Sequence, residues 1–435
     1  MNTVKILVIL MCIGLVGTQA CSQSMDSNLF TKTPTPIKDT PLITPTTTLI
    51  SNIATTTTQP NCISAIGQPA IPLINQGKIV LSGYLGVSGM SLDNPSYLLD
   101  VQSGEKIMLP QDENKIIIPT SYSVSSNREW LAYAQISLDA EPPNGTLHIV
   151  DAEGVEHNVI ATNIDQRGTL WIDDTHLLIE NLKESEATSE PKAGVLLISS
   201  ITGEIKELSN AYPDQWNGDN LDWEFTLSRI LYNPSLTKAI YPTFVEPNRI
   251  MRLIDIRTNK VLLDVPTTDY GKFPVWSPDG KRLAFATQTK KEAGWDAYRD
   301  EVFVLTEDGE FIQLTNFSKD DGYSYITGLS WSTDSNKVAV WINNTDWEKG
   351  YTGVHLAVLD MTTGNIHEYC DIQISDGQTY IPDMGNPIWS PDNQYILFNL
   401  IDPSDDKHLL VVSTEVSTGK TFLIDENYRG VGWLR

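Results

Sequence analysis

The chain has 435 residues, of which 55 are acidic and 30 basic, so its formal net charge is −25, and 40% of its residues are hydrophobic. This content is too high for a disordered polymer and the length allows one large core or two ordinary ones. The negative charge argues against a nucleic-acid partner, because a phosphate-binding surface needs clustered Lys and Arg.

The N-terminus reads as an export signal. Lys5 precedes an apolar run from Ile6 to Val16 that is shorter than the roughly 20 residues of a membrane-spanning helix. We predict that residues 1–20 are removed after Ala20. Ala20 and Cys21 resemble the cleavage site of bacterial lipoprotein signals, although Thr18 and Gln19 depart from it, and ordinary signal peptidase could cut at the same bond.

The resemblance implies lipidation of Cys21 and hence anchoring of an exported protein to the cell membrane or cell surface. The alternative is a secreted or periplasmic protein. Residues 31–60 are dominated by Thr and Pro and lack apolar periodicity, so we predict that 21–60 is a disordered tether of partly polyproline character. A spacer of this kind is useful when its N-terminus is fixed.

The remainder of the chain repeats one local pattern. The segment 274–285, with the sequence PVWSPDGKRLAF, recurs at 329–340 and 387–398, and degenerate copies occupy 124–133, 171–179 and 232–241. Each copy is an apolar strand, a turn of Ser, Pro, Asp and Gly or Asn, and a second apolar strand. Pro presets φ, Asp and Ser bond nearby amides, and Gly or Asn tolerates positive φ, so each copy predicts a β-hairpin.

A second hairpin follows each first one, which makes seven units. The predicted second hairpins span 97–109, 147–160, 195–208, 251–265, 302–314, 356–369 and 409–424. Repeated four-stranded units predict an all-β fold, a seven-bladed β-propeller over residues 61–435. The first unit, 78–110, lacks a first strand, and 430–434 is a first strand without a blade. We therefore expect the C-terminal strand to close the ring as the innermost strand of the first blade.

Trp276 to Lys281 resembles the repeat of the TolB-like (WD40-like) propeller family, which reads Trp-Ser-Pro-Asp-Gly-Lys before an apolar strand. The resemblance implies a propeller but no particular chemistry, since relatives serve as binding scaffolds, as gating domains of peptidases and, less often, as enzymes.

The predicted loops between second and third strands, and between blades, are long, whereas the hairpin turns are tight. Long loops usually carry function. We expect a binding face made of the aromatic residues of these loops, which are Trp216, Trp223, Tyr270, Trp295, Tyr298, Tyr323, Tyr325, Trp347, Tyr351 and Tyr380. The alternative is that they only pack their own loops. Trp276, Trp331, Trp389 and Trp433 recur at one repeat position and are expected to pack between blades.

The sequence contains few catalytic signals. It lacks a Gly-x-Ser-x-Gly elbow, and its six histidines show no spacing typical of metal ligands. We therefore expect no catalytic residue, metal or cofactor, and a monomeric binding scaffold for an envelope protein, a peptide or a glycan. The alternative is an extracytoplasmic carbohydrate-active enzyme or lyase that uses a carboxylate pair across the propeller channel.

Four cysteines are present, and Cys62 and Cys370 are the two that remain in the folded domain once Cys12 and Cys21 are accounted for. Outside the cytoplasm two such thiols favour a disulfide, here between the N-terminus of the domain and the sixth blade. Two unpaired buried thiols are the alternative.

Overall fold

The computed structural model describes strands and their connections within residues 61–435. The described residues are 61–62, 77–83, 95–112, 115–117, 121–137, 145–162, 164–181, 195–207, 231–245, 248–267, 272–288, 300–316, 323–346, 350–370, 381–382, 385–402 and 405–435. They form strands, turns and irregular segments, and none of them lies in a helix. The predicted signal and tether, 1–60, lie outside the described residues.

No helix able to cross a membrane occurs in the part of the chain that the structure describes.

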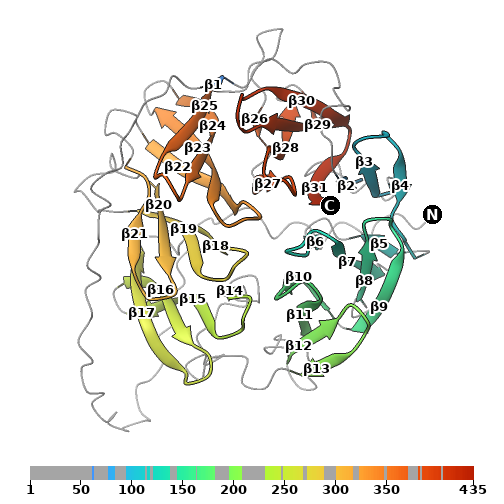
Figure 1. Ribbon diagram of the computed structural model, residues 1–435, viewed down its shortest axis with the longest axis horizontal. Helices are drawn as coiled ribbons and strands as arrows, with labels where there is room; N and C mark the ends of the chain where they lie inside the picture. Colours follow the sequence, from blue (N-terminus) through green and yellow to red (C-terminus); the bar gives the residue numbers. More distant parts are fainter. Residues whose placement is uncertain are drawn as a thin grey trace, which may run out of the picture. The chain divides into compact units, whose positions relative to one another are not determined.

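The described strands form seven sheets (Figure 1). The first contains β31 (Arg429–Leu434), β2 (Lys78–Ser82), β3 (Tyr97–Asp100) and β4 (Lys106–Met108). The second contains β5 (Lys115–Ile117), β6 (Ser123–Val124), β7 (Trp130–Ser137), β8 (Gly145–Asp151) and β9 (Glu156–Thr162). The third contains β10 (Ile164–Trp171), β11 (His176–Asn181), β12 (Val195–Ser200) and β13 (Ile205–Glu207).

The fourth sheet contains β14 (Leu231–Tyr232), β15 (Lys238–Val245), β16 (Asn248–Asp255) and β17 (Lys260–Thr267). The fifth contains β18 (Lys272–Trp276), β19 (Arg282–Gln288), β20 (Asp300–Thr306) and β21 (Phe311–Gln313). The sixth contains β22 (Tyr323–Trp331), β23 (Lys337–Asp346), β24 (Gly350–Asp360), β25 (Ile366–Cys370) and, parallel to β25, β1 (Asn61–Cys62). The seventh contains β26 (Ile381–Pro382), β27 (Ile388–Trp389), β28 (Tyr395–Asp402), β29 (Asp405–Glu415) and β30 (Thr421–Glu426).

Strands that follow one another along the chain pair antiparallel within each sheet, as the blades of a β-propeller do. The predicted first hairpins are present as β6–β7, β10–β11, β14–β15, β18–β19, β22–β23 and β27–β28. The predicted second hairpins are present as β3–β4, β8–β9, β12–β13, β16–β17, β20–β21, β24–β25 and β29–β30. The sequence repeats therefore correspond to repeated sheets.

The first sheet combines the two ends of the domain. β31 pairs antiparallel with β2, with Trp433 opposite Ile79 and Leu434 opposite Lys78. The side chain of Asn399 in β28 accepts a hydrogen bond from the Gly430 amide at 2.7 Å and donates one to the Gly430 carbonyl at 3.0 Å. The C-terminal strand is thus held by the first sheet and by the seventh.

Seven hydrophobic clusters lie between the described sheets, and each combines side chains of two of them. One joins the third and fourth sheets through Leu178 and Tyr232. Another joins the seventh and first through Leu397 and Trp433. Since burial of apolar surface is the main stabilising term, packing between neighbouring sheets holds the fold together.

The sixth sheet differs from the sequence prediction. Tyr323, Tyr325 and Tyr351 were expected in loops, but Tyr323 and Tyr325 lie in β22 and Tyr351 in β24. Thr345 in β23 is the direct partner of Tyr323 in β22 on one side and of Tyr351 in β24 on the other. Backbone pairing covers 343–346 and 350–354, where a long loop between second and third strands was expected.

Candidate functional site

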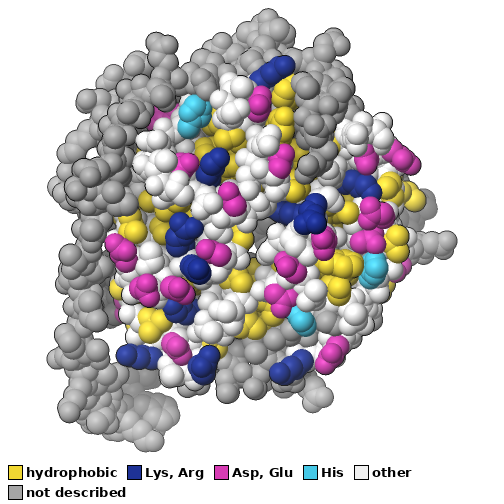
Figure 2. Space-filling view, in the orientation of Figure 1, with side chains coloured by type: hydrophobic (Ala, Val, Ile, Leu, Met, Phe, Trp, Pro, Cys, Tyr) yellow, Lys and Arg dark blue, Asp and Glu magenta, His cyan; other side chains and the backbone are white. Residues whose placement is uncertain are grey.

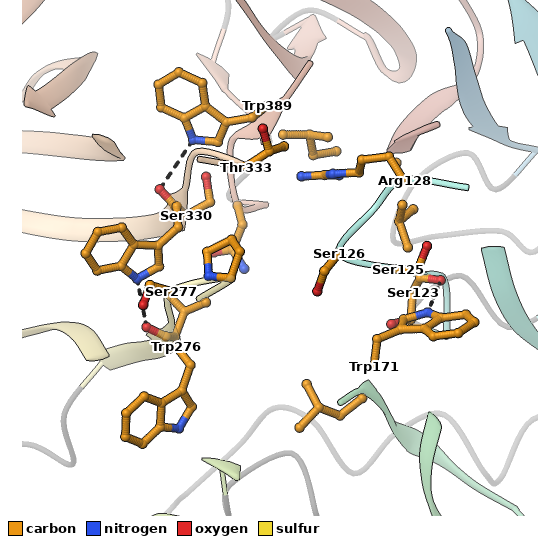
Figure 3. Close-up of a pocket in the computed structure, with 18 of the residues that line it drawn as sticks. Ser123, Ser125, Ser126, Arg128, Trp171, Trp276, Ser277, Ser330, Thr333 and Trp389 are labelled. Carbon is orange, nitrogen blue, oxygen red and sulfur yellow. Dashed lines mark hydrogen bonds between the residues drawn. The ribbon is translucent and has the colours of Figure 1, made fainter. Parts of the chain in front are cut away.

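One cavity of about 410 Å³ is lined by residues from all seven described sheets (Figures 2 and 3). The lining residues are Val431 and Gly432 of the first sheet; Tyr122, Ser123, Val124, Ser125, Ser126 and Arg128 of the second; Leu170 and Trp171 of the third; Tyr232 and Pro234 of the fourth; Val275, Trp276, Ser277 and Pro278 of the fifth; Ser330, Trp331 and Thr333 of the sixth; and Asn386, Pro387, Ile388 and Trp389 of the seventh. Its volume lies within the range of about 300–1,000 Å³ found for ligand pockets.

These residues lie at the ends of first strands and in the turns that join first strands to second strands, which we call the first-hairpin turns. By strand order, the long predicted loops leave the opposite ends of the sheets. The cavity, called the tight-turn pocket below, is therefore at the end that the sequence analysis did not select.

The first-hairpin turns of the fifth, sixth and seventh sheets share one hydrogen-bond pattern. In the sixth, the Ser332 hydroxyl donates to Asp334 at 2.6 Å and accepts from the Lys337 amide at 2.8 Å. The Asn336 amide donates to Asp334 at 3.0 Å. Ser277 and Asp279 repeat this arrangement in the fifth sheet, as do Ser390 and Asp392 in the seventh. The hydroxyls of Ser277, Ser332 and Ser390 are thus used by their own turns.

The second sheet contains the same turn with different residues. Ser125 donates its hydroxyl hydrogen to Asn127 at 2.6 Å and accepts from the Trp130 amide at 3.0 Å. The Glu129 amide donates to Asn127 at 3.1 Å. The amide oxygen of Asn127 therefore does the work of an aspartate.

The fourth residue of five first-hairpin turns has positive φ. The values are 70° for Gly280, 61° for Ser335, 59° for Asn393, 52° for Leu236 and 64° for Arg128. This left-handed conformation suits Gly and Asn but is unfavourable for a long side chain. Arg128 is consequently held in a backbone conformation that its residue type disfavours.

Neighbouring turns are linked through this fourth position. The Ser335 hydroxyl accepts a hydrogen bond from the Asp279 amide at 3.1 Å, and the Asn393 side chain accepts one from the Thr333 amide at 2.7 Å. The first sheet has no such turn, because its strands β31 and β2 come from opposite ends of the chain. Arg128 occupies the fourth position in the second sheet, so the neighbouring first sheet offers its side chain no turn with which to form a hydrogen bond.

Tryptophans form much of the wall, and their indole N–H groups are engaged. Trp171 donates to the carbonyl of Ser123 at 3.0 Å, Trp331 to that of Val275 at 3.0 Å and Trp389 to that of Ser330 at 3.4 Å. Each bond reaches from one sheet to the sheet before it. The tryptophans therefore fix adjacent sheets and present carbon surface to the pocket.

Arg128 is the charged residue among the described residues that line the pocket, and none of these is an Asp or Glu. Figure 3 shows its guanidinium extending into the cavity. Within the described part of the chain this group has no hydrogen bond or ion pair. Burial lowers the pKa of the guanidinium to about 10, so it stays protonated at neutral pH. The buried Oγ of Ser330, beside the pocket, also has no hydrogen-bond partner.

An unpaired cation in a partly buried, apolar site is costly, because desolvation is not offset by a counter-charge. A ligand anion would supply the missing partner. The arrangement can bind but offers no acid–base pair among its described lining residues.

Most residues of the sequence-predicted binding face lie outside the described residues, namely Trp216, Trp223, Tyr270, Trp295, Tyr298, Trp347 and Tyr380. Tyr323, Tyr325 and Tyr351 lie in strands and do not line the tight-turn pocket. Trp331, Trp389 and Trp433 are buried, as expected for packing residues, whereas Trp276 is partly buried.

Sequence reasoning missed Arg128. The signal was available in the degenerate repeat 124–133, where an arginine occupies the turn position held by Gly280 and Asn393 elsewhere. Arg128 is the charged residue among the described fourth positions of these turns.

Cys62 and Cys370 are direct partners in the parallel register of β1 and β25. The predicted attachment of the domain's N-terminus to the sixth unit is thus present at the level of the backbone. Among the described residues, no group of three or more His, Cys, Asp or Glu side chains is placed to hold a metal ion.

Neither a protein-family model nor a curated protein matches the sequence. Solved structures that resemble the chain are TolB-like and other propeller proteins. TolB from Acinetobacter baumannii is 14% identical over 78% of this chain and 78% of its own, with a TM-score of 0.38. A putative TolB from Agrobacterium tumefaciens is 14% identical over 63% and 86%, with a TM-score of 0.35. The β-propeller domain of the Trilobed protease from Pyrococcus furiosus is 11% identical over 71% and 83%, with a TM-score of 0.43. These likenesses concern the fold alone.

Proposed function

We propose that this chain is an exported, surface-tethered, seven-bladed propeller that binds a partner at the tight-turn pocket. The observation that carries the proposal is the pocket itself, to which each of the seven described sheets contributes the end of a strand or a turn. A ring of sheets around one axis places those ends together, and concave, mostly apolar sites with few polar groups are the usual binding sites of proteins.

Two features support seven blades and a closed ring. The hydrophobic clusters join first to second, second to third, and so on to seventh and first. The pairing of β31 with β2 completes a four-stranded sheet from the two chain ends. Closure of this kind removes exposed sheet edges and stabilises the ring.

The pocket supports binding over hydrolysis or lyase chemistry. An enzyme with channel carboxylates would need Asp or Glu side chains facing the cavity, and the described lining contains none. The carbohydrate-active enzyme therefore remains a prediction from sequence without support from this pocket. A protein-interaction scaffold is the function that the propeller fold and the cavity favour together.

Export and tethering rest on residues 1–60. The apolar run before Ala20, the cysteine at 21 and the Thr/Pro-rich stretch favour a lipid-anchored domain held away from a membrane. Such placement suits the capture of envelope components. Mass spectrometry of the mature N-terminus tests it: a diacylglyceryl group on Cys21 is expected, and a free N-terminal cysteine or an uncleaved signal would contradict it.

Partner capture from envelope extract tests the pocket. Ser126 is exposed at the pocket, so Ser126→Trp fills its mouth without replacing a core residue. Ser103→Trp adds the same bulk to an exposed turn of the first sheet and is the matched control. We expect proteins retained by the wild type and Ser103→Trp to be lost from Ser126→Trp.

A third variant addresses the long-loop face predicted from the sequence. Trp295→Ala combined with Trp347→Ala is expected to retain the same partners as the wild type. If Ser126→Trp keeps the full partner list, or the double variant loses it, the pocket is not the binding site.

A further inference from the structure

We propose that Arg128 receives a carboxylate of a peptide ligand, whose apolar body fills the rest of the tight-turn pocket. This inference rests on the proposed function, since it assumes that the pocket binds, and it adds the chemical class of the ligand. The group that makes the contact is the guanidinium, which extends into the cavity without a partner from the described residues (Figure 3).

Charge favours an anion with a single negative charge. The chain has a net charge of −25, yet the lining residues that the structure describes include one arginine and no acidic residue. A planar guanidinium matches a carboxylate through two parallel N–H···O bonds. A phosphate would bring nearly two negative charges to one cation inside an acidic protein, so the carboxylate is the better counter-charge.

The walls favour a peptide over a sugar acid. A sugar needs several free donors and acceptors for its hydroxyls. Here the hydroxyls of Ser125 and Ser277 are bonded within their turns, and the indole N–H groups of Trp171, Trp331 and Trp389 are bonded to backbone carbonyls. Besides the exposed Ser126 and the unpartnered Ser330 hydroxyl, the described lining is carbon surface from aromatic, proline and branched side chains beside one cation, which suits an apolar segment with a free carboxylate.

The backbone at Arg128 fits a residue that is kept for its side chain. Its φ of 64° is shared with the fourth residue of the other turns, at 70° for Gly280, 61° for Ser335, 59° for Asn393 and 52° for Leu236, so the conformation belongs to the repeat and the charged side chain is what differs. An arginine gains nothing for the turn here, because its side chain makes no bond to a neighbouring turn, unlike Asn393. Residues in disfavoured conformations cluster at ligand sites, where binding compensates for the strain.

The test uses the purified full chain and two synthetic peptide libraries. Both contain N-acetylated hexapeptides of apolar residues; one ends in a free carboxylate and the other in an amide. We expect the immobilised protein to retain free-acid peptides about ten- to a hundredfold better than amides, the effect of a charge-assisted hydrogen-bonded pair. Arg128→Gln should abolish this preference.

The control is Arg435→Gln. Arg435 lies next to the same turn, where its amide donates to the Arg128 carbonyl at 2.7 Å, but its side chain is 66% exposed and does not line the pocket. This variant removes one positive charge and should keep the preference. A third arm offers oligoglucuronate and inorganic phosphate as competitors, and neither should displace a retained peptide at equal concentration.

Equal retention of acids and amides would overturn the proposal, as would an unchanged preference in Arg128→Gln or displacement by oligoglucuronate or phosphate. If Ser126→Trp loses envelope partners but Arg128→Gln keeps them, the carboxylate proposal fails while the proposed function stands. Arg128→Gly separates folding from binding, since Gly is the natural residue at this φ: it should fold at least as stably and still lose the preference.

We also infer, from a different observation, a disulfide between Cys62 and Cys370. The parallel register makes these residues direct partners on β1 and β25. Neighbouring strands lie about 4.8 Å apart, which falls within the Cα separation of about 4.4–6.8 Å that disulfides span. Two thiols would lose two protons and two electrons to an oxidising protein disulfide, which becomes a dithiol, and one S–S bond forms by thiol–disulfide exchange.

Non-reducing proteolysis and mass spectrometry of the full chain test this inference. After alkylation of the unfolded, unreduced protein we expect one cross-linked peptide that contains Cys62 and Cys370. Reduction should lower the melting temperature of the wild type, and should leave that of Cys62→Ser with Cys370→Ser unchanged. Recovery of both cysteines in alkylated form from protein purified without reductant would overturn it.

Discussion

The first-hairpin turns of the fifth and second sheets share one hydrogen-bond pattern but differ in their fourth residue. In both turns a serine hydroxyl, that of Ser277 or Ser125, accepts a hydrogen bond from a backbone amide across the turn. In both, the third side chain, Asp279 or Asn127, accepts a hydrogen bond from another backbone amide. Both have a fourth residue with positive φ, but it is Gly280 in one and Arg128 in the other. One turn is optimised for folding, whereas the other retains a charged side chain that folding does not need. The difference separates what the repeat requires from what the site requires.

Removing the strand that supports the second turn should have the largest effect. β31 contains Trp433 and Leu434, both fully buried, and is followed by Arg435, whose amide bonds Arg128. Deletion of 430–435 loses two large apolar side chains at about 2–5 kcal/mol each, and also opens the first sheet. Calorimetry should show a melting temperature lower by more than about 10 °C, or an unfolded product.

Deletion of Arg435 alone is the control and should shift the melting temperature by no more than about 2 °C, the effect of one hydrogen bond. An unchanged melting temperature in the longer deletion would mean that β31 does not close the ring.

Gly280→Val should break the fifth turn. A Cβ at Gly280 would approach Pro234 Cδ at 3.2 Å, and the φ of 70° is unfavourable for a branched residue. We expect a loss of about 2 kcal/mol in the free energy of unfolding, measured by urea denaturation. Gly309→Val, at a φ of 86° with no atom near its Cβ, carries the same backbone strain without the contact, so the difference between the two isolates packing. Equal losses would show that Pro234 plays no part.

Arg128→Gly should act in the opposite direction. It relieves a disfavoured φ and removes an unpaired cation, against the greater chain entropy of unfolded Gly. We expect the free energy of unfolding to rise by about 0.5–1 kcal/mol in urea denaturation, together with loss of the peptide preference. A clear destabilisation would indicate that Arg128 is a folding residue, and would remove the contrast between the two turns.

Lowering the pH should weaken the turns that contain an aspartate but not the turn that contains Asn127. This is the smallest of the expected effects. Burial raises the pKa of Asp334, but hydrogen bonds from the Ser332 hydroxyl and the Asn336 amide outweigh it and hold that pKa below its ordinary value. A carboxyl with a depressed folded pKa stabilises above its unfolded pKa of about 3.9 and ceases to do so as pH falls through the folded value.

Between pH 6 and pH 3, amide exchange at Asn336 should therefore accelerate relative to Glu129, after correction for intrinsic rates. Asp334→Asn should remove the difference. Parallel behaviour of the two amides in the wild type would contradict the assignment.

The repeated hairpins could be predicted from sequence because their cause is local. Ser, Asp and Gly act within six residues, so Trp276 to Arg282 specifies its own turn. The lengths of β22, β23 and β24 could not be predicted from the sequence. The pairing of Tyr323 and Tyr351 with Thr345 depends on contacts between strands that local sequence does not specify.

The tight-turn pocket was missed for another physical reason. Sequence analysis weighted loop length and aromatic content, whereas the pocket is lined by strand ends and turns contributed by seven separate sheets. Arg128 has no preceding turn to bond because the first two strands of the first sheet, β31 and β2, are not consecutive and are not joined by a turn. No local pattern contains that information.

Hydrogen exchange with and without a retained partner tests most directly whether the tight-turn pocket is the binding site. We predict slower exchange in peptides that contain Ser125 to Arg128, Ser277 to Gly280 and Ser332 to Ser335. No change is expected in residues 210–224 and 290–299, which belong to the long loops predicted from the sequence. Protection confined to those loops, with the first-hairpin turns unchanged, would contradict the account.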